Sequence, residues 1–461
     1  MNFLYRPVPI ASLVFFRLVF GILAFADVVG VFGFYHLYKD VFNAEGFHFH
    51  YLGFEWLHPL PEPFMSLFFI SMMIAAVLIF VGKWYRISTL WFAIGFTWLF
   101  LLEKTQYLNH GYLFCWLSFV MFFLPANRWF SLDAQKNPTI RTREIPFWSL
   151  AILPFLMAVV YFFGGIAKIN PDWLQAMPLK LWLGYKKEYW LIGPLISKEP
   201  VAWFMAYGGL ILDLTAAFFM LGKRTRKYAF AAVVFFHFSN LLVFNIGIFP
   251  WLSVALTALF FPPDFPIKIL EKFRNGTTGV SKFMTKVIIN RFKVHGSVQN
   301  ARLWHGHARW KPVISVVLAV IILLHITLPL RHHLFPGDVA WTEEGHRYAW
   351  RMMLRAKRGH GTFNVVDART GETEEVDPND YLTRRQNRNI YTHPDMIWEF
   401  AQFLEKEYKA KGWEPQVYAN IYCQLNGSSY FRYIDEEVDL AAEPWYYFRH
   451  ADWIIPWKSK D

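Results

Sequence analysis

Cysteine is nearly absent from this chain of 461 residues, which holds only Cys115 and Cys423. Two cysteines so far apart exclude a disulfide framework and a cysteine-based metal site. Glycine-rich phosphate loops and a Gly-x-Ser-x-Gly nucleophile elbow are also lacking, as are internal repeats and low-complexity segments. The chain starts without the pattern of a cleavable signal peptide, so we expect the first apolar segment to remain as an anchor.

Apolar residues are abundant instead, with 55% hydrophobic and 20% aromatic residues against 18% charged residues. Several apolar runs approach the roughly 20 residues that a helix needs to cross the hydrocarbon core of a bilayer. The expected spans cover residues 9–35, 64–82, 87–103, 110–125, 146–167, 200–221, 228–244, 251–262 and 312–330. Since the eighth is short, residues 245–250 should enter the membrane as irregular backbone. The sequence predicts an α-helical polytopic membrane bundle of about nine spans, one of them partly re-entrant.

The formal net charge of +11 would suggest nucleic acid in a soluble protein, but the basic residues lie mainly in short loops between apolar runs. Loops on one predicted side hold 21 Lys and Arg, against 7 on the other. Because basic loops stay in the cytoplasm, we expect a cytoplasmic N-terminus and an extracytoplasmic C-terminal region, and no nucleic-acid partner. Residues 280–294 could form a basic amphipathic helix on membrane lipid or a solvated linker.

Residues 331–461 change character, because charges become frequent and alternating patterns replace the long apolar runs. Strands are expected at 348–354, 362–366, 416–425 and 430–434, and a helix at 394–409. We expect a small C-terminal β-rich extramembrane domain at 331–461, carried by a transmembrane domain at 1–330.

Polar side chains at membrane depth are rare and need a reason. They are Asn109, His110, Lys168, Asp213, His237, Asn240 and Asn245. Lys168 could be an interfacial lysine that reaches water, and Asn109 could cap a helix. His237 and Asn240 could bond helix to helix, and Asp213 is expected to have a structural ion-pair partner within the bundle. If the seven converge at the outer end of one bundle, they could instead form a site.

The chain resembles the vitamin K-dependent γ-glutamyl carboxylase family. The matching motifs are Glu103-Lys-Thr, Asn109-His110-x-Tyr-Leu, Ala126-Asn-Arg-x-x-Ser131, Gly164-Gly-Ile-Ala-Lys168, Leu212-Asp-Leu214, Phe236-His237 with Asn240, Ile246-Gly-Ile-Phe249, Trp341-Thr, Tyr348-x-Trp350-x-Met-Met353 and Asp367-x-Arg-Thr-Gly-Glu372. They run in order from the first half of the chain into its last quarter.

The resemblance implies roles for residues of this sequence. Lys168 stands at the catalytic base, with Ala167 at the first position of the family's Lys-Lys pair, and His110 and Asn109 stand beside it. We expect the cofactor site to involve His237, Asn240 and Asn245. We expect the glutamate substrate to meet Trp341, Tyr348, Trp350, Met352 and Met353, where Arg355 replaces a family histidine. No metal is expected, since the spacing of His48, His50 and His58 is loose.

The implied reaction oxidises reduced vitamin K with O₂ to an alkoxide, which takes the γ-hydrogen of glutamate so that CO₂ can add. A lysine in an apolar surrounding can lose its charge, and a neutral Lys168 could start the reaction by taking a proton from the quinol. The partner would be a glutamate-containing peptide or protein. Two alternatives stay open: a quinol-oxygenating epoxidase that carboxylates no protein, and a transporter or lipid-binding scaffold.

Overall fold

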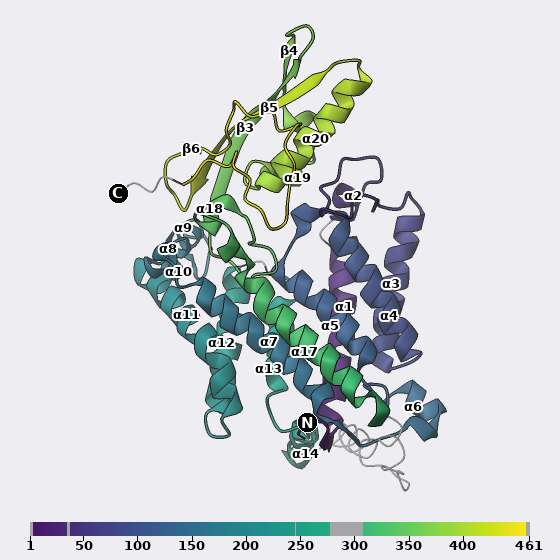
Figure 1. Cartoon of the computed structure of the whole chain (residues 1–461). Coiled ribbons are helices and arrows are strands. Elements are labelled where there is room, and N and C mark those ends of the chain that lie inside the picture. Colours follow the sequence, from purple (N-terminus) through teal and green to yellow (C-terminus); the bar gives the residue numbers. More distant parts are fainter. Residues whose placement is uncertain (1–2, 35–36, 245, 277–307, 458–461) are drawn as a thin grey trace.

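The computed structural model describes residues 3–34, 37–244, 246–276 and 308–457. A bundle of helices carries a small sheet at one end (Figure 1). We call the end of the bundle next to the sheet, where α5 begins and α7 ends, the sheet end, and the opposite end the far end.

All nine apolar segments form helices, with bounds close to those expected. They are α1 (Ala11–Val29, continued by a π-helical turn at Gly30–Phe34), α3 (Phe64–Val81), α4 (Tyr85–Leu102), α5 (Asn109–Phe123), α7 (Phe147–Ala167), α11 (Glu199–Leu221), α12 (Arg226–Val243), α13 (Phe249–Ala258) and α17 (Lys311–Thr327). The other described α-helices are α2 (Leu37–Val41), α6 (Leu132–Lys136), α8 (Pro171–Leu174), α9 (Leu179–Gly184), α10 (Gly193–Ile196), α14 (Phe265–Gly276), α18 (Val339–Thr342), α19 (Arg384–Ile390) and α20 (Pro394–Ala410). Strands are β1 (Pro7–Pro9), β2 (Glu144–Pro146), β3 (Lys357–Asp367), β4 (Thr373–Val376), β5 (Pro415–Leu425) and β6 (Phe431–Arg432).

Six of the described helices are long and apolar enough to cross a membrane, which is fewer than the nine spans expected. They cover Ala11–Gly33, Phe64–Val81, Tyr85–Leu102, Phe147–Ala167, Glu199–Leu221 and Lys311–Leu334. Helix α5 has 15 residues and α13 has 10, and both fall short of the roughly 17 residues that a span requires. Helix α12 carries two basic residues in its first turn and His237 and Asn240 near its end. Length thus limits α5 and α13, whereas polar residues, two of them expected in a site, limit α12.

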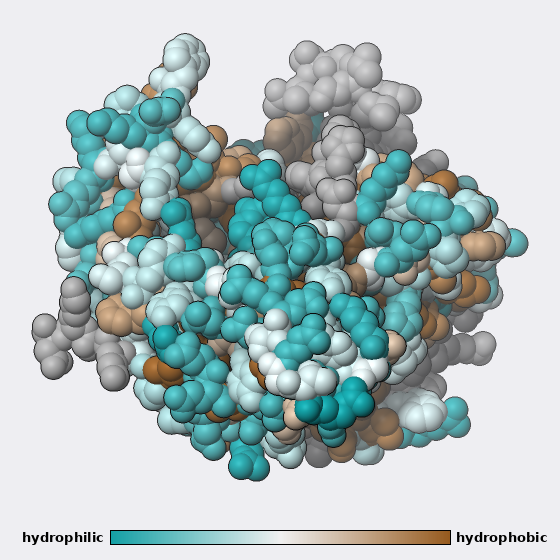
Figure 2. All heavy atoms as spheres, turned by 90° about the horizontal axis from the view of Figure 1, so that it is seen from above, coloured by the Kyte–Doolittle hydropathy of each residue, from teal (hydrophilic) through white to brown (hydrophobic). Residues whose placement is uncertain are grey.

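The outer surface of the bundle is apolar. Large hydrophobic side chains are exposed along α3 at Leu67, Ile70, Ile74 and Val77, and along α17 at Val313, Val316, Val317, Val320 and Leu323. Viewed from the sheet end, the molecule instead shows mainly hydrophilic side chains (Figure 2). This distribution fits helices that face lipid and a sheet that faces water.

The sheet has four antiparallel strands in the order β4-β3-β5-β6. In β5 every second residue is buried, and the buried face packs on the apolar side of α20, as the alternating pattern predicts. Expected strands at 362–366 and 416–425 are therefore confirmed, as is the helix at 394–409. The strand expected at 430–434 shrinks to two paired residues, with Ile434 bridging to Ile454.

Residues 348–354 form a loop and not the expected strand. Tyr348, Trp350 and Met353 all have left-handed φ angles of 65°, 56° and 53°, a conformation that β structure excludes and that non-glycine residues seldom adopt. A hydrogen bond fixes the loop to the segment before α5: the backbone N–H of Tyr348 donates to the hydroxyl oxygen of Tyr107 at 2.5 Å. Such strained segments often lie at functional sites.

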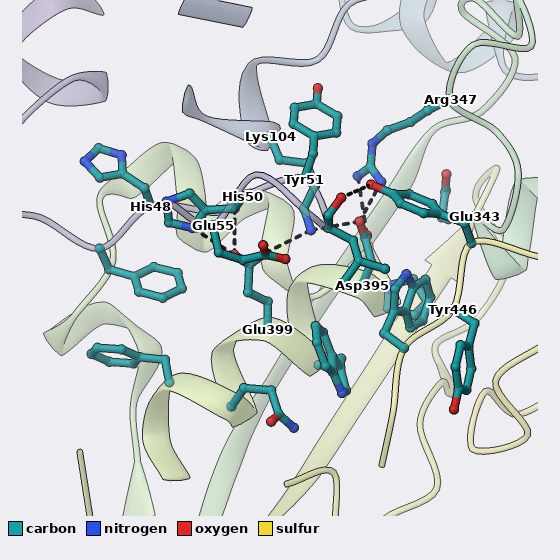
Figure 3. Close-up of a pocket in the computed structure, with 18 of the residues that line it drawn as sticks. His48, His50, Tyr51, Glu55, Lys104, Glu343, Arg347, Asp395, Glu399 and Tyr446 are labelled. Carbon is teal, nitrogen blue, oxygen red and sulfur yellow. Dashed lines mark hydrogen bonds and ion pairs between the residues drawn. The ribbon is translucent and has the colours of Figure 1, made fainter. Parts of the chain in front are cut away.

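A buried network of charges joins the sheet region to the bundle (Figure 3). Lys104, just after α4, places Nζ 2.9 Å from both Asp395 Oδ2 and Glu399 Oε2 of α20. Arg347 places Nη1 2.6 Å from the same Asp395 oxygen. Nearby Arg347 and Lys104 hold the pKa of Asp395 far below its usual range despite burial, so its carboxylate stays charged.

Gly165 of α7 allows the close approach of α7 to α11, and Gly164 faces the same helix. A Cβ built on Gly165 would lie 2.8 Å from the backbone N and side chain of Leu214, so only glycine allows this approach. A Cβ on Gly164 would lie 3.6 Å from Asp213 Oδ2. The close packing brings the C-terminal end of α7 against the middle of α11.

Candidate active site

A cavity of about 270 Å³ lies at the sheet end of the bundle. Its lower wall comes from α5, α7, α11 and α12, and its upper wall comes from the loop before β3 and from α19 and α20. Among the residues proposed from the sequence, it collects Asn109, His110, Lys168, Asp213, His237, Asn240, Met352 and Met353.

Lys168 follows the last residue of α7 and is 6% exposed. Its Nζ lies 2.6 Å from Asp213 Oδ2 of α11 and donates to the carbonyl oxygen of Gly164 at 3.2 Å. The ammonium also lies 5.3 Å from the centroid of the Trp173 ring. Asp213 therefore has the ion-pair partner that its position in an apolar helix requires, and Lys168 points into the bundle and not toward water.

His110 and Asn109 form the first turn of α5. The His110 ring stacks on Phe249 at 5.4 Å between centroids, and no hydrogen bond joins its nitrogens to any residue in the described ranges. Asn109 Oδ1 accepts a hydrogen bond from the Tyr107 hydroxyl at 3.0 Å. The imidazole of His110 is thus free to bond a ligand in the cavity.

His237 and Asn240 lie one turn apart on α12 and face the same cavity. His237 Nε2 is 3.0 Å from the hydroxyl of Tyr161, which lies 2.9 Å from Thr257 Oγ1. His237 Nδ1 is buried without a hydrogen-bond partner in the part of the chain that the structure describes. An unsatisfied buried nitrogen is costly, so a polar ligand atom beside it would stabilise the site.

Three arginines form the upper wall: Arg347, Arg351 and Arg355. Arg347 pairs with Asp395, and Arg355 pairs with Glu343 through Nε. Arg351 has no ion pair or hydrogen bond to its guanidinium within the described ranges. Burial lowers the pKa of Arg351, a cost that an anionic ligand would offset.

Glu343, His346 and His393 place one ligand atom each within 4.8 Å of one another, a group that could hold a metal ion and that the sequence did not predict. Burial lowers the pKa of both histidines well below the usual value, so both rings are neutral. Arg355 already pairs with Glu343, and Lys357 Nζ lies 3.6 Å from the same carboxylate oxygen. These two cations would repel a metal ion, so the group fits a polar wall better than a metal centre.

Three of the expected substrate residues lie outside the cavity. Trp341 is in the core below the sheet, where its Nε1 donates to the carbonyl oxygen of Ile455 at 2.7 Å. Trp350 is buried in the bundle core beside Tyr112, and Tyr348 faces a separate, polar pocket above the loop. Asn245, the third residue expected in the cofactor site, lies outside the described residues. The segment 280–294, expected as a basic helix or a linker, lies outside them too.

Sequence patterns did not single out Arg351, His346 and His393, because they belong to the C-terminal region 331–461, where charged residues are common. One signal was present: the motif Tyr348-x-Trp350-x-Met-Met353 already included position 351. Only the folded loop shows that its side chain lines the cavity.

Comparison with known proteins finds a family model for each of two regions of the chain. The HTTM domain model matches residues 5–265, and the model of the vitamin K-dependent gamma-carboxylase lumenal domain matches residues 310–460. No solved structure matches the chain significantly. With an HTTM domain over more than half of its length followed by this lumenal domain, the chain belongs to the vitamin K-dependent gamma-carboxylase family.

Proposed function

We propose that this protein couples the O₂-dependent epoxidation of reduced vitamin K to the carboxylation of protein glutamate by CO₂. One observation carries the proposal: a single cavity joins Lys168, His110 and His237 of the bundle to Arg351 of the lumenal domain. A hydroquinone needs an apolar slot with hydrogen-bonding groups at its hydroxyls, and a glutamate side chain needs a cation. The two kinds of wall meet in this one space.

The lower wall fits the head group of reduced vitamin K. Phe236, Phe249 and Trp173 contribute rings, while His110 and the unpartnered Nδ1 of His237 contribute nitrogens that could bond the hydroxyls. The cavity is smaller than the roughly 300 Å³ at the lower end of small-molecule pockets. A prenyl tail must therefore extend beyond it, and an apolar groove of about 1320 Å³ that shares Phe244 with the cavity adjoins it.

Reduced vitamin K would supply, on oxidation by O₂, the strong base that no side chain can provide for removing a γ-hydrogen. The protein would start this chemistry at Lys168 Nζ, which can accept a proton only when its amine is neutral. Since Asp213 lies 2.6 Å away, a neutral amine requires the proton of the pair to sit on Asp213. Because both side chains are buried, the neutral pair avoids two buried charges. We assign Lys168 as the base, Asp213 as its positioning partner, and His110 and Asn109 as hydrogen-bonding groups beside the quinol.

The test is to supply the purified full chain with reduced vitamin K, O₂, labelled CO₂ and a glutamate-containing peptide. Vitamin K epoxide together with labelled peptide is the expected result. Epoxide without label would make the protein a quinol-oxygenating enzyme that carboxylates no protein. A chain that forms neither product is a transporter or scaffold, and the proposed function is wrong.

Arg351 should bind the glutamate carboxylate. Replacing Arg351 by Gln should raise KM for the peptide roughly tenfold or more, because a hydrogen bond to a charged group is worth about 1.5–3 kcal/mol. Quinol binding should be unchanged. Arg358→Gln, which removes an exposed arginine of β3, is the matched control. An equal change of KM in both variants would remove Arg351 from the site.

We further propose that residues 1–330 form a catalytic transmembrane domain with a cytoplasmic N-terminus, and that residues 331–461 form an extracytoplasmic domain. The support is the excess of Lys and Arg in the loops of one side. A cysteine introduced at exposed Ser429 should react with a membrane-impermeant reagent in intact cells, whereas one at exposed Lys136 should react only after permeabilisation. The reverse labelling pattern would invert the topology.

A further inference from the structure

A second crevice, of about 510 Å³, lies at the far end of the bundle, opposite the candidate active site. Its walls come from the last turn of α5, the first turns of α7 and α17, and the segment around β2. The lining is largely apolar and includes Phe123, Ile152, Val313 and Val317. The proposed reaction uses none of these residues.

Two arginines, Arg86 at the start of α4 and Arg128 after α5, line the crevice. Both are half-buried. Within the described ranges, neither guanidinium has an ion-pair or hydrogen-bond partner, and Arg86 Cζ lies 5.9 Å from the ring centroids of both Tyr85 and Phe122. Burial lowers the pKa of Arg128, and the nearby charge of Arg86 lowers it further. Two positive charges therefore lie near each other in a partly desolvated crevice.

The chain offers little to neutralise this pair. Residues 277–307, which lie outside the described ranges, contain no Asp or Glu. Glu144 is the one acidic residue among those that line the crevice, so the described lining keeps a net positive charge. In addition, the indole N–H of Trp148 is buried without a hydrogen-bond partner in the described part of the chain. Two guanidinium cations and an unpaired indole N–H would together favour an anion with several acceptor oxygens.

The apolar part of the crevice indicates what carries that anion. It runs beside α17, where Val313 and Val317 are 51% and 50% exposed. Most of α17 is not covered by the rest of the protein, so its apolar side chains are accessible to a hydrocarbon chain lying against the bundle. A free phosphate ion would satisfy the arginines and leave these apolar walls uncovered.

We propose that the far end of the bundle binds one anionic phospholipid, with its phosphate between Arg86 and Arg128 and an acyl chain in the crevice between α5, α7 and α17. Basic pockets between membrane helices recognise such headgroups through the same combination of charge and apolar contact. The site is distinct from the quinol cavity and does not depend on the proposed reaction.

The experiment measures lipid binding to the purified full chain by native mass spectrometry and by the shift of its thermal midpoint. The probes are phosphatidylglycerol, phosphatidylcholine and inorganic phosphate. Phosphatidylglycerol should bind and raise the midpoint. The double variant Arg86→Gln/Arg128→Gln should bind it at least tenfold more weakly, since two charge-assisted contacts are lost. The matched control Lys83→Gln/Lys136→Gln removes two exposed cations near the same end and should bind like the wild type.

A third variant tests the apolar half without touching charge. Val317→Trp should fill the crevice and weaken phosphatidylglycerol binding in a protein that keeps both arginines. Equal affinity for phosphatidylcholine, or equal loss in the lysine control, would overturn the proposal. Stabilisation by inorganic phosphate to the same extent would also overturn it, because the crevice would then hold an ion and no lipid.

Discussion

Lys168→Ala should lower the rate of vitamin K epoxidation by roughly 10²–10⁴-fold, the range that a general base contributes. In the proposed mechanism the amine of Lys168 takes the proton of the quinol, while Asp213, 2.6 Å from Nζ in the same cavity, holds the amine in position. The free energy of unfolding should change much less than for loss of a single partner of an ordinary buried pair, because Asp213 can become protonated in the variant.

The readout is epoxide formed per folded molecule, measured beside the thermal midpoint. Lys180→Ala, which removes a half-exposed lysine paired with Glu199 at the same end of the bundle, should leave the rate unchanged. A soluble primary amine should partly restore epoxidation to Lys168→Ala, with recovery that increases with the concentration of free amine and therefore with pH. Wild-type turnover in Lys168→Ala would show that this lysine is structural and that the family architecture is shared without its chemistry.

Asp395→Ala should have the largest effect on stability, about 3–5 kcal/mol, because it removes the carboxylate that pairs with buried Arg347 and accepts two hydrogen bonds from its guanidinium. Lys104 would keep only Glu399. The variant should lower the unfolding midpoint of the lumenal domain and loosen its contact with the bundle. Glu405→Ala, in the same helix, removes the pair with Lys409 on the surface and should cost less than about 1 kcal/mol.

Acid should produce a milder form of the same effect in the wild-type protein. The folded-state pKa of Asp395 lies far below its usual range, so its contribution is fully present above the unfolded value of about 3.9 and is lost as pH falls below it. The midpoint of the wild type should decrease more between pH 5 and pH 3 than that of Asp395→Asn, which cannot titrate there. Parallel pH profiles, or an Asp395→Ala midpoint equal to that of Glu405→Ala, would contradict this role.

Much of the architecture could be predicted because its physical cause is local in the sequence. Apolar runs such as 147–167 must become helices in lipid, where no water satisfies the backbone. The alternation in β5 and the helical period of α20 likewise set which face of each is buried. The loop at 348–354 could not be predicted in this way, since its left-handed φ angles break the alternating pattern and its first residue, Tyr348, is hydrogen-bonded to the distant Tyr107.

The residues of the candidate site likewise fall into those that the sequence could predict and those that only the fold identifies. Lysine, aspartate and histidine in apolar helices are costly wherever they lie, so Lys168, Asp213 and His237 could be singled out from the sequence by that cost alone. The sequence does not say which of these side chains contact one another, because that depends on how α7 approaches α11. The glycines of α7 permit this approach but do not specify it, and only the fold shows that Lys168 pairs with Asp213. The place of Arg351 in the candidate site was decided entirely by tertiary structure, because an arginine in a polar domain has no burial cost until a strained loop carries it to the wall of a cavity.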